Sequence, residues 1–126
     1  MSKRSLLDNV TKGRLGEKAA KKRLLQLGYN ILETNYRVKE GEIDIVSMDG
    51  DVLVFVEVKA RSNRKFGGGE ESVDAKKMVK LSEVALSYIT EKSLHEMTVR
   101  FDVVAVDMSV NPPKIKVIKD AFESTV

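Results

Sequence analysis

One segment limits the possible folds of this chain more than any other, the apolar run that starts at Val52 and ends at Lys59. Its valines and phenylalanine favour an extended backbone, so this run is the clearest strand in the sequence. Side chains of a strand alternate between its two faces. One face then carries Val54, Val56 and Val58, and the other carries Leu53, Phe55, Glu57 and Lys59. An apolar strand face therefore ends in a carboxylate beside an ammonium group.

A second strand, over residues 42–46, precedes this run and forms a hairpin with it. Asp49-Gly50 is a strong signal for a two-residue turn between the two strands. That turn pairs Asp44 with Phe55, so Asp44 and Glu57 become diagonal neighbours on one face, with Cβ atoms about 7 Å apart. A three-residue turn would shift the pairing by one and place the two acids on opposite faces. The predicted site depends on that parity.

The remaining elements follow from hydrophobic periodicity and from helix and turn signals. They are a helix over 12–27, a strand over 29–38, a glycine-containing loop over 61–72, a helix over 74–90 with Asp74 as N-cap, and strands over 98–107 and 114–119, the last at an edge. The order α-β-β-β-α-β-β predicts an α/β sandwich built on a mixed sheet. The length of 126 residues predicts one domain, 1–126, with its core at residues 12–119.

Composition narrows the class of protein and its location. The chain has no cysteine, which excludes thiol nucleophiles, thiolate zinc sites and disulfides. It has no apolar run near the roughly 20 residues that a membrane-spanning helix needs. Its N-terminal apolar stretch is also shorter than the about 7–15 residues of a signal peptide. We therefore expect a cytoplasmic protein that has no membrane partner.

Positive charge is concentrated in two parts of the chain. Residues 1–40 hold ten Lys or Arg and four Asp or Glu, and residues 59–80 hold seven and three. Clustered positive charge attracts phosphate backbones through counterion release. A solvated, lysine-rich helix face explains the same pattern, so charge alone leaves both interpretations open.

Asp44, Glu57 and Lys59 together form a minimal site for phosphodiester hydrolysis. Mg²⁺ binds through one or two carboxylates and keeps several waters. A bound metal lowers the pKa of its water and neutralises charge that develops on a phosphate. A neighbouring lysine orients the attacking hydroxide or stabilises the pentavalent phosphorus. The alternative is a surface ion pair at a strand end, with a contribution of about 0–1 kcal/mol.

Glu17 is a third candidate acid. On the first helix it shares a face with Ala20 and Leu24, so it continues the apolar face that packs on the sheet. An acid at this place either lies near the metal or its water, or is favoured by the helix macrodipole at the helix start.

Six motifs occur in one order along the chain. They are Gly13-x-x-Gly16-Glu17-x-x-Ala20, Gly28-Tyr29-x-Ile31-Leu32-x-x-Asn35-x-Arg37, Gly41-Glu42-Ile43-Asp44-Ile45-Val46, Phe55-Val56-Glu57-Val58-Lys59-x-Arg61, Ser72-Val73-Asp74-x-x-Lys77-x-x-Lys80-Leu81 and Arg100-Phe101-Asp102-Val103-Val104-Ala105-Val106. In this combination, over residues 12–107, the sequence resembles the YraN family of bacterial endonuclease-like proteins. That family is similar in turn to archaeal Holliday-junction resolvases and to the wider PD-(D/E)XK nucleases. The resemblance implies a restriction-endonuclease-like sandwich, with a central mixed sheet flanked by helices.

The resemblance also implies roles by position. Glu17 would be the acid of the helix, Asp44 and Glu57 the ligands of Mg²⁺ or Mn²⁺, and Lys59 the catalytic lysine. Ile43 stands where such sites usually have a proline, and that departure removes no ligand. The basic residues expected to contact nucleic acid are Arg37, Arg61, Arg64, Lys65, Lys76, Lys77 and Lys80. Contacts of this kind position a phosphate backbone without reading its sequence, and the alternative is that these residues are solvated charges.

We therefore predict a metal-dependent endonuclease that hydrolyses phosphodiester bonds in DNA, with branched or structured DNA as the expected substrate, and with a homodimer as one possible assembly. The runner-up is a nucleic-acid-binding module whose nuclease site is weak or unused. A structural partner protein is the third interpretation, and it leaves the inward acids unexplained. Metal-dependent cleavage separates the first from the second, and salt-sensitive DNA binding separates both from the third.

Overall fold

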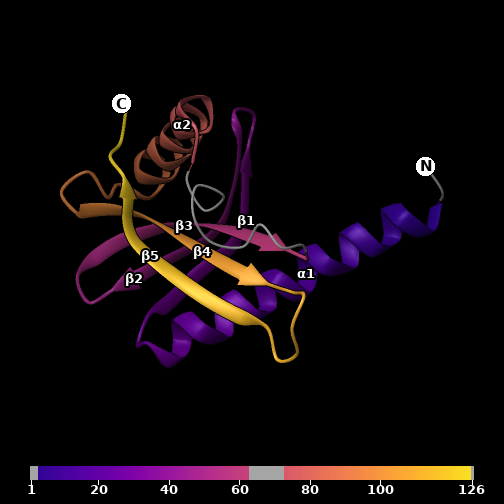
Figure 1. Ribbon diagram of the computed structural model, residues 1–126. Helices are drawn as coiled ribbons and strands as arrows, with labels where there is room; N and C mark the ends of the chain where they lie inside the picture. The colour runs from indigo at the N-terminus through magenta and orange to yellow at the C-terminus, as the bar shows by residue number, and fades with distance from the viewer. Residues whose placement is uncertain (1–2, 63–72, 126) are drawn as a thin grey trace.

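A computed structural model describes the backbone of residues 3–62 and 73–125, and side chains from residue 13 onward within these ranges. The elements of this part of the chain are α1 (Lys3–Gln26), β1 (Asn30–Val38), β2 (Gly41–Asp49), β3 (Val52–Arg61), α2 (Ala75–Lys92), β4 (Thr98–Asp107) and β5 (Lys114–Phe122). The strands form one sheet in the order β1-β2-β3-β4-β5, with α1 against one face and α2 against the other (Figure 1). The predicted α/β sandwich with a mixed sheet is confirmed.

The sheet is mixed because β3 and β4 run parallel while the other neighbours are antiparallel. Parallel strands need a crossover connection, and α2 supplies it. Asp74 caps this helix as predicted, since its carboxylate accepts the Lys77 backbone N–H at 2.8 Å. The helix ends at Ser93, whose backbone is left-handed with a φ of 58°.

Two apolar cores lie on opposite faces of the sheet. The α1-side core contains Ala20 and Leu24 together with Val54 and Val56. The α2-side core contains Leu53, Phe55, Leu81, Val84, Tyr88 and Phe101. Residues of β3 therefore alternate between the two cores as predicted. Because both faces of β3 are covered, this strand fixes the positions of both helices.

The register of the β2–β3 hairpin differs from the prediction by two residues. The pair that closes the turn is Asp49–Val52, so the turn residues are Gly50 and Asp51 rather than Asp49 and Gly50. Gly50 has a φ of 62°, which matches a glycine at the first central position of a type II′ turn. The predicted pairing of Asp44 with Phe55 is therefore wrong, because Phe55 pairs with Val46. A shift of two residues preserves the parity on which the predicted site depends.

Helix α1 begins earlier than the predicted residue 12 and continues through both of its glycines. Gly13 is exposed, and a Cβ atom there would meet nothing within 4 Å. Gly16 is buried, and a Cβ atom there would lie 2.6 Å from the Cβ atom of Ala60 on β3. Gly16 therefore allows α1 to approach the end of β3, and it fixes the position of the adjacent Glu17.

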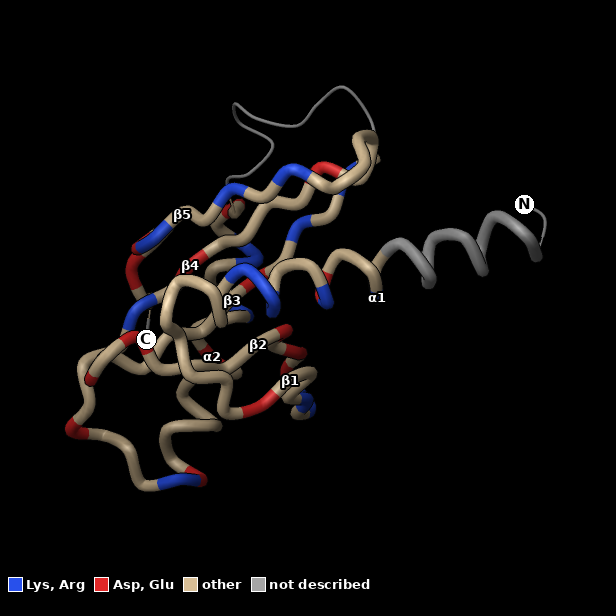
Figure 2. Tube along the Cα trace, turned by 90° about the horizontal axis from the view of Figure 1, so that it is seen from below, with Lys and Arg blue, Asp and Glu red and all other residues tan. Residues whose placement is uncertain are grey.

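Several other boundaries differ from the prediction by a few residues, because strand ends depend on neighbouring strands, whereas β4 spans Thr98–Asp107 as predicted. β2 extends to Asp49 and β3 to Arg61, while β5 continues to Phe122. β5 lies at an edge of the sheet as predicted, and Figure 2 shows basic residues spaced along it. Lysines on an edge strand oppose pairing with another sheet. Neither described helix is long and apolar enough to span a membrane.

The two glycines of α1 predict stability changes of opposite sign. Gly13→Ala should raise the free energy of unfolding by about 0.5–1 kcal/mol, because alanine favours a helix over glycine. Gly16→Ala should lower it by about 1–3 kcal/mol, because the new methyl group overlaps Ala60. Urea unfolding measures both changes. The double variant Gly16→Ala, Ala60→Gly should recover part of the loss; a loss equal to that of Gly16→Ala alone would contradict the proposed contact.

Candidate functional site

Strands β2 and β3 separate before their pairing reaches the start of β2. The ladder between them ends at the pair Ile45–Val56. Beyond this pair, the start of β2 stays bonded to β1, and residues 57–61 of β3 stay bonded to β4. We call the opening between residues 41–44 and residues 57–61 the fork. Figure 1 shows the β1–β2 hairpin turning toward α2, away from the end of β3.

Asp44 lies at the base of the fork. Ile43 packs in the α2-side core and Ile45 in the α1-side core. Residues two apart in a regular strand face the same side, so the β2 backbone departs from the regular strand pattern between them. Asp44 Oδ2 accepts the backbone N–H of Val58 at 2.8 Å. The carboxylate of Asp44 therefore spans the fork and accepts the backbone hydrogen bond that a paired strand would otherwise accept from β3.

Asp44 also forms a hydrogen bond with the side chain of Glu57. Burial, followed by this hydrogen bond and the charge of Glu57, raises the pKa of Asp44 to about 8. The Val58 N–H opposes this shift, and the more distant Glu17 adds to it. Asp44 therefore keeps its proton to a higher pH than an isolated aspartate does.

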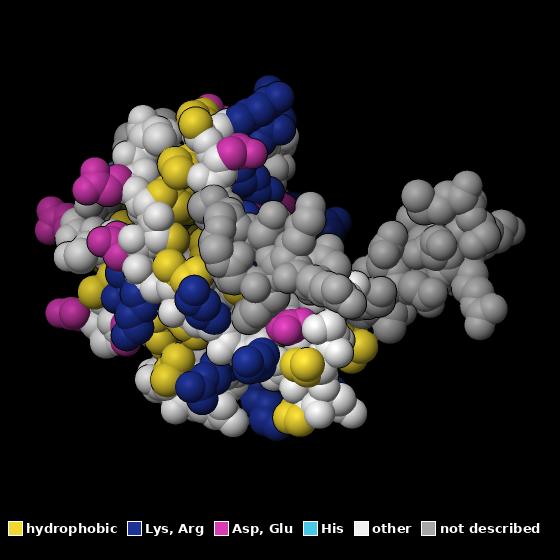
Figure 3. Space-filling view, in the orientation of Figure 1, with side chains coloured by type: hydrophobic (Ala, Val, Ile, Leu, Met, Phe, Trp, Pro, Cys, Tyr) yellow, Lys and Arg dark blue, Asp and Glu magenta, His cyan; other side chains and the backbone are white. Residues whose placement is uncertain are grey.

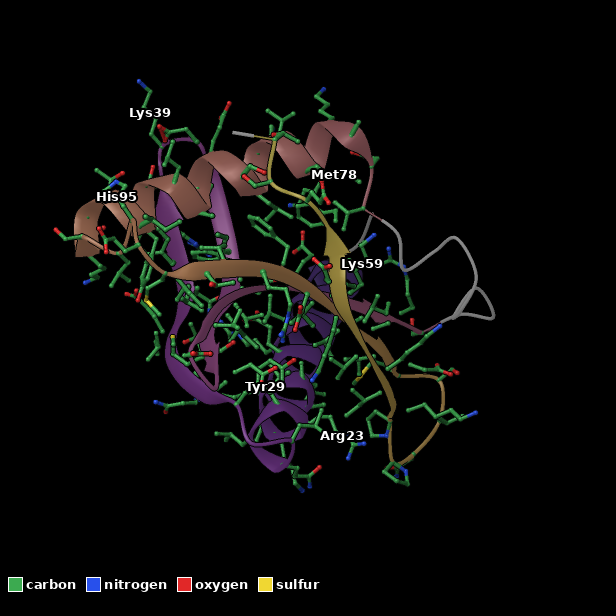
Figure 4. All side chains as sticks on the ribbon, turned by 90° about the vertical axis from the view of Figure 1, so that its left-hand side faces the viewer. Arg23, Tyr29, Lys39, Lys59, Met78 and His95 are labelled. Carbon is green, nitrogen blue, oxygen red and sulfur yellow. The ribbon has the colours of Figure 1, made fainter. Side chains whose placement is uncertain are left out.

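Glu57 extends from the fork toward α2. Its Oε2 atom lies 3.3 Å from Lys77 Nζ, and its side chain is 12% exposed. Lys59 follows two residues later on the same face of β3, and it is half-buried. Figure 4 places Lys59 toward the end of α2 that carries Met78. The fork thus brings two ammonium groups to the α2 side of the acid pair, and Lys77 contacts the acid pair rather than only facing solvent.

Glu17 approaches the fork from the opposite, α1 side. The Asn35 side-chain amide, oriented with its nitrogen toward the acids, donates to Glu17 Oε1 at 3.0 Å and to Glu42 Oε1 at 2.9 Å. Burial and then the Glu42 carboxylate raise the pKa of Glu17, while Asn35 and Arg37 lower it. Glu17 therefore lies near Asp44 but is held by a different partner.

Asn35 occupies the position on β1 that faces Asp44. Its neighbours Thr34 and Tyr36 pair with Ile45 and Ile43, and its own backbone is left-handed with a φ of 53°. Such a conformation is uncommon for a residue other than glycine, although asparagine adopts it more readily than most. The irregular backbone of β1 at Asn35 thus lies opposite the irregular backbone of β2 at Asp44. Both strands therefore bend at the place where the acids meet.

The donor set of the fork fits one hard cation. Mg²⁺ binds through one or two carboxylates and completes its shell with water, and Asp44 and Glu57 supply two carboxylates. A bound cation would offset the repulsion from Glu57 that helps to raise the pKa of Asp44. Among the described residues, no three His, Cys, Asp or Glu side chains are grouped closely enough to hold a metal ion. Glu17 is therefore not a third ligand in this arrangement.

The other predicted basic residues lie around the fork at different distances from it. Arg37 Nε lies 3.1 Å from Glu42 Oε2, so this arginine is paired with an acid beside Glu17. Arg61 ends β3, and Lys76 and Lys80 are exposed near the start of α2. The predicted residues Arg64 and Lys65 lie outside the described residues.

The motif that begins at Arg100 stabilises the sheet and is not part of the fork. Asp102 is fully buried and accepts the Tyr29 hydroxyl at 2.7 Å and Arg100 Nε at 2.8 Å. Arg100 also bonds to Asp49 Oδ2 at 2.8 Å. Sequence reasoning identified this motif only as part of a resemblance. Its role follows from the structure, because its partners are far apart in the chain.

A broad cavity borders α2 and the β1–β2 turn rather than the acid pair. It has a volume of about 710 Å³ and is lined by Glu40, Glu83, Leu86, Ser87, Thr90 and Glu91. Three carboxylates repel a phosphate backbone, so this cavity does not suit a nucleic acid. Figure 3 shows basic side chains grouped over other parts of the surface, with many acidic ones toward one edge.

Comparison with known proteins identifies close relatives of the whole chain. The family model described as "Uncharacterised protein family UPF0102" matches residues 16–106. A UPF0102 protein of Syntrophus aciditrophicus is 45% identical over 118 residues, which cover 94% of this chain and 93% of that protein. A UPF0102 protein of Clostridioides difficile is 50% identical over 100 residues, covering 79% and 88%.

One solved structure shows a weak similarity, that of Pyrococcus furiosus SfsA in complex with Ca²⁺. It is 16% identical, with a TM-score of 0.36, and the match covers 91% of this chain and 65% of SfsA. A similarity of this size supports no conclusion about this chain. The family match is different in kind, because it covers most of the sequence, including Glu17, Asp44, Glu57 and Lys59. The chain therefore belongs to UPF0102, the YraN family that its motifs predict.

Proposed function

We propose that this protein is a metal-dependent endonuclease of the PD-(D/E)XK kind, which hydrolyses phosphodiester bonds in DNA. The observation that carries the proposal is the hydrogen-bonded pair Asp44–Glu57, in which the pKa of Asp44 is raised to about 8. Burial and like charge make such a pair unfavourable, and perturbed acids of this kind are typical of functional sites.

Three fork residues, Asp44, Glu57 and Lys59, and the neighbouring Glu17 each have a role in this mechanism. Asp44 and Glu57 would hold one Mg²⁺ or Mn²⁺, which when bound activates a water and neutralises charge on the phosphate. Lys59 lies on the same strand face as Glu57 and would stabilise the negative charge that develops on the phosphorus oxygens. Glu17 approaches from the α1 side and would orient a water or accept its proton.

The surface around the start of α2 supports binding to a polyanion. Lys76 and Lys80 are exposed, four residues apart on one helix, and they lie close in sequence to Lys77, which contacts Glu57. Arg61 ends the strand that carries Glu57 and Lys59. A phosphate backbone held by these side chains would pass beside the acid pair. The alternative function, a DNA-binding module without cleavage, rests on the same surface.

The fork residues predict a loss of cleavage. Asp44→Asn, Glu57→Gln and Lys59→Ala should each reduce the rate of metal-dependent DNA cleavage by at least about 100-fold, the effect of removing one preorganised charged group. The two amide variants also remove repulsion of the phosphates, so they should bind DNA in EDTA at least as tightly as the wild type. The measurement is cleavage of single-stranded, duplex, flapped and four-way DNA with Mg²⁺ or Mn²⁺.

Glu83→Gln is the matched control, because Glu83 is an exposed acid on α2 that borders the large acidic cavity. It should cleave like the wild type. Cleavage by the double variant Asp44→Asn, Glu57→Gln at the wild-type rate would show that the activity lies elsewhere. A wild type that binds DNA but cleaves none of the substrates would favour the binding module.

The acid pair also predicts a stability cost. The pKa of Asp44 is raised in the folded protein, so the folded state binds a proton more tightly than the unfolded state. Stability therefore falls as pH rises from about 4 toward the folded pKa of about 8. Asp44→Asn keeps an acceptor for Val58 and can donate to Glu57. It should raise the free energy of unfolding at pH 7 by at least about 1 kcal/mol, the equivalent of one pKa unit.

Urea unfolding in EDTA across pH 4–8 measures this difference, which should shrink toward pH 4. Asp51→Asn, in the exposed turn of the same hairpin, is the control and should change stability by less than about 0.5 kcal/mol. A destabilised Asp44→Asn at pH 7 would contradict the raised pKa of Asp44.

The lysines of α2 predict a change in the salt dependence of binding. Lys76→Ala, Lys80→Ala should weaken duplex binding and reduce the slope of log affinity against log salt by up to about two units, one for each lost phosphate contact. The control is Lys39→Ala, Lys92→Ala, which removes equal charge near the other end of α2 (Figure 4). Equal slopes for the two double variants would show that the start of α2 does not contact DNA.

A further inference from the structure

A small cavity opens on the α1 side of the fork, opposite the side to which Glu57 extends. It has a volume of about 220 Å³ and is lined by Glu17, Lys18, Lys21, Thr34, Asn35 and Ile45. We call it the α1-side pocket. Cavities for drug-sized ligands measure about 300–1,000 Å³, so this pocket holds at most one nucleotide. The pocket shares Glu17 with the candidate site. Asp44 lies between Asn35, which lines the pocket, and Glu57.

The pocket combines positive charge with hydrogen-bonding groups that are held in place. Lys18 and Lys21 are exposed and three residues apart on α1, so their ammonium groups lie on neighbouring parts of one helix face. Opposite them, Asn35 has a fixed left-handed backbone, and its amide donates to Glu17. A carboxylate offers about four acceptor positions, so Glu17 can accept further hydrogen bonds.

These groups fit the two parts of a nucleotide. Two ammonium groups attract a phosphate, while Glu17 can accept from an amino group on a base edge, and the Thr34 hydroxyl can donate or accept. A free phosphate would use only the lysines and would be repelled by Glu17. An apolar ligand would leave the polar side chains that line the pocket without hydrogen-bond partners.

We propose that the α1-side pocket binds one unpaired nucleotide of the strand that enters the candidate site. The substrate is then DNA with single-stranded character beside the cut, an inference that rests on the proposed function. A base inside a duplex is stacked and paired, and its extraction costs a few kcal/mol, least where the strand is already single. Binding in the pocket therefore selects against an intact duplex.

The test is binding of the full-length protein in EDTA to a labelled single-stranded oligodeoxynucleotide and to the blunt duplex of the same sequence. Thr34→Trp fills the pocket without a change of charge. It should weaken single-strand binding by at least about fivefold, the equivalent of about 1 kcal/mol, and leave duplex binding unchanged. Thr98→Trp, at an exposed threonine that starts β4, is the matched control. Equal single-strand affinity of the two tryptophan variants would overturn the proposal.

A second comparison does not depend on the folding of a tryptophan variant. Lys21 lines the α1-side pocket, whereas Lys22 lines a separate groove beside Pro112 and Pro113. Lys21→Ala should weaken single-strand binding more than Lys22→Ala does, although each removes one charge. Equal losses would assign the effect to general attraction and would overturn the proposal.

Cleavage assays separate this proposal from the proposed function. If the wild type cleaves DNA but Thr34→Trp binds single strands as Thr98→Trp does, the pocket assignment fails and the nuclease stands. If the wild type cleaves nothing but Thr34→Trp loses single-strand binding, the nuclease fails and the pocket stands as part of a binding module.

Discussion

The structure depends on how strand β3 satisfies its backbone hydrogen bonds. β3 pairs with β4 along its full length, but it pairs with β2 only as far as Val56. Beyond that point the Val58 N–H has no strand partner on the β2 side, and the Asp44 carboxylate accepts it. A buried N–H left without an acceptor costs about 1–3 kcal/mol. The acid at the centre of the candidate site therefore also closes a gap in the sheet.

This double role explains why unfavourable charge persists at the fork. The separation of β2 from β3 brings Asp44 against Glu57, and the bend at Asn35 brings Glu17 and Glu42 to the other side. Lys77 and Arg37 each neutralise an acid at the margin of this group. Burial and the neighbouring Glu57 raise the pKa of Asp44. The fold thus concentrates acids where apolar packing would be more stable, and departures of this kind from the most stable packing are expected at functional sites.

The sequence predicted the features that depend on local pattern. The alternation of β3, the cap at Asp74 and the face of Glu17 follow from periodicities that neighbouring residues impose. The hairpin register was wrong because Gly50 can serve at either central position of a two-residue turn, and only the strand pairing decides between them. The fork, the left-handed Asn35 and the Lys77–Glu57 contact join segments distant in the chain. Such features arise from tertiary packing, which no local pattern encodes.

The hydrogen bond from Val58 to Asp44 has a consequence for the history of the family. Apolar side chains at this position would leave a partly buried amide unbonded, so selection for folding alone favours a short side chain with an acceptor oxygen. Asparagine meets that requirement, and a single base change in an aspartate codon produces it. A folded relative that lacks the acid is therefore one mutational step away, and its architecture can stay intact.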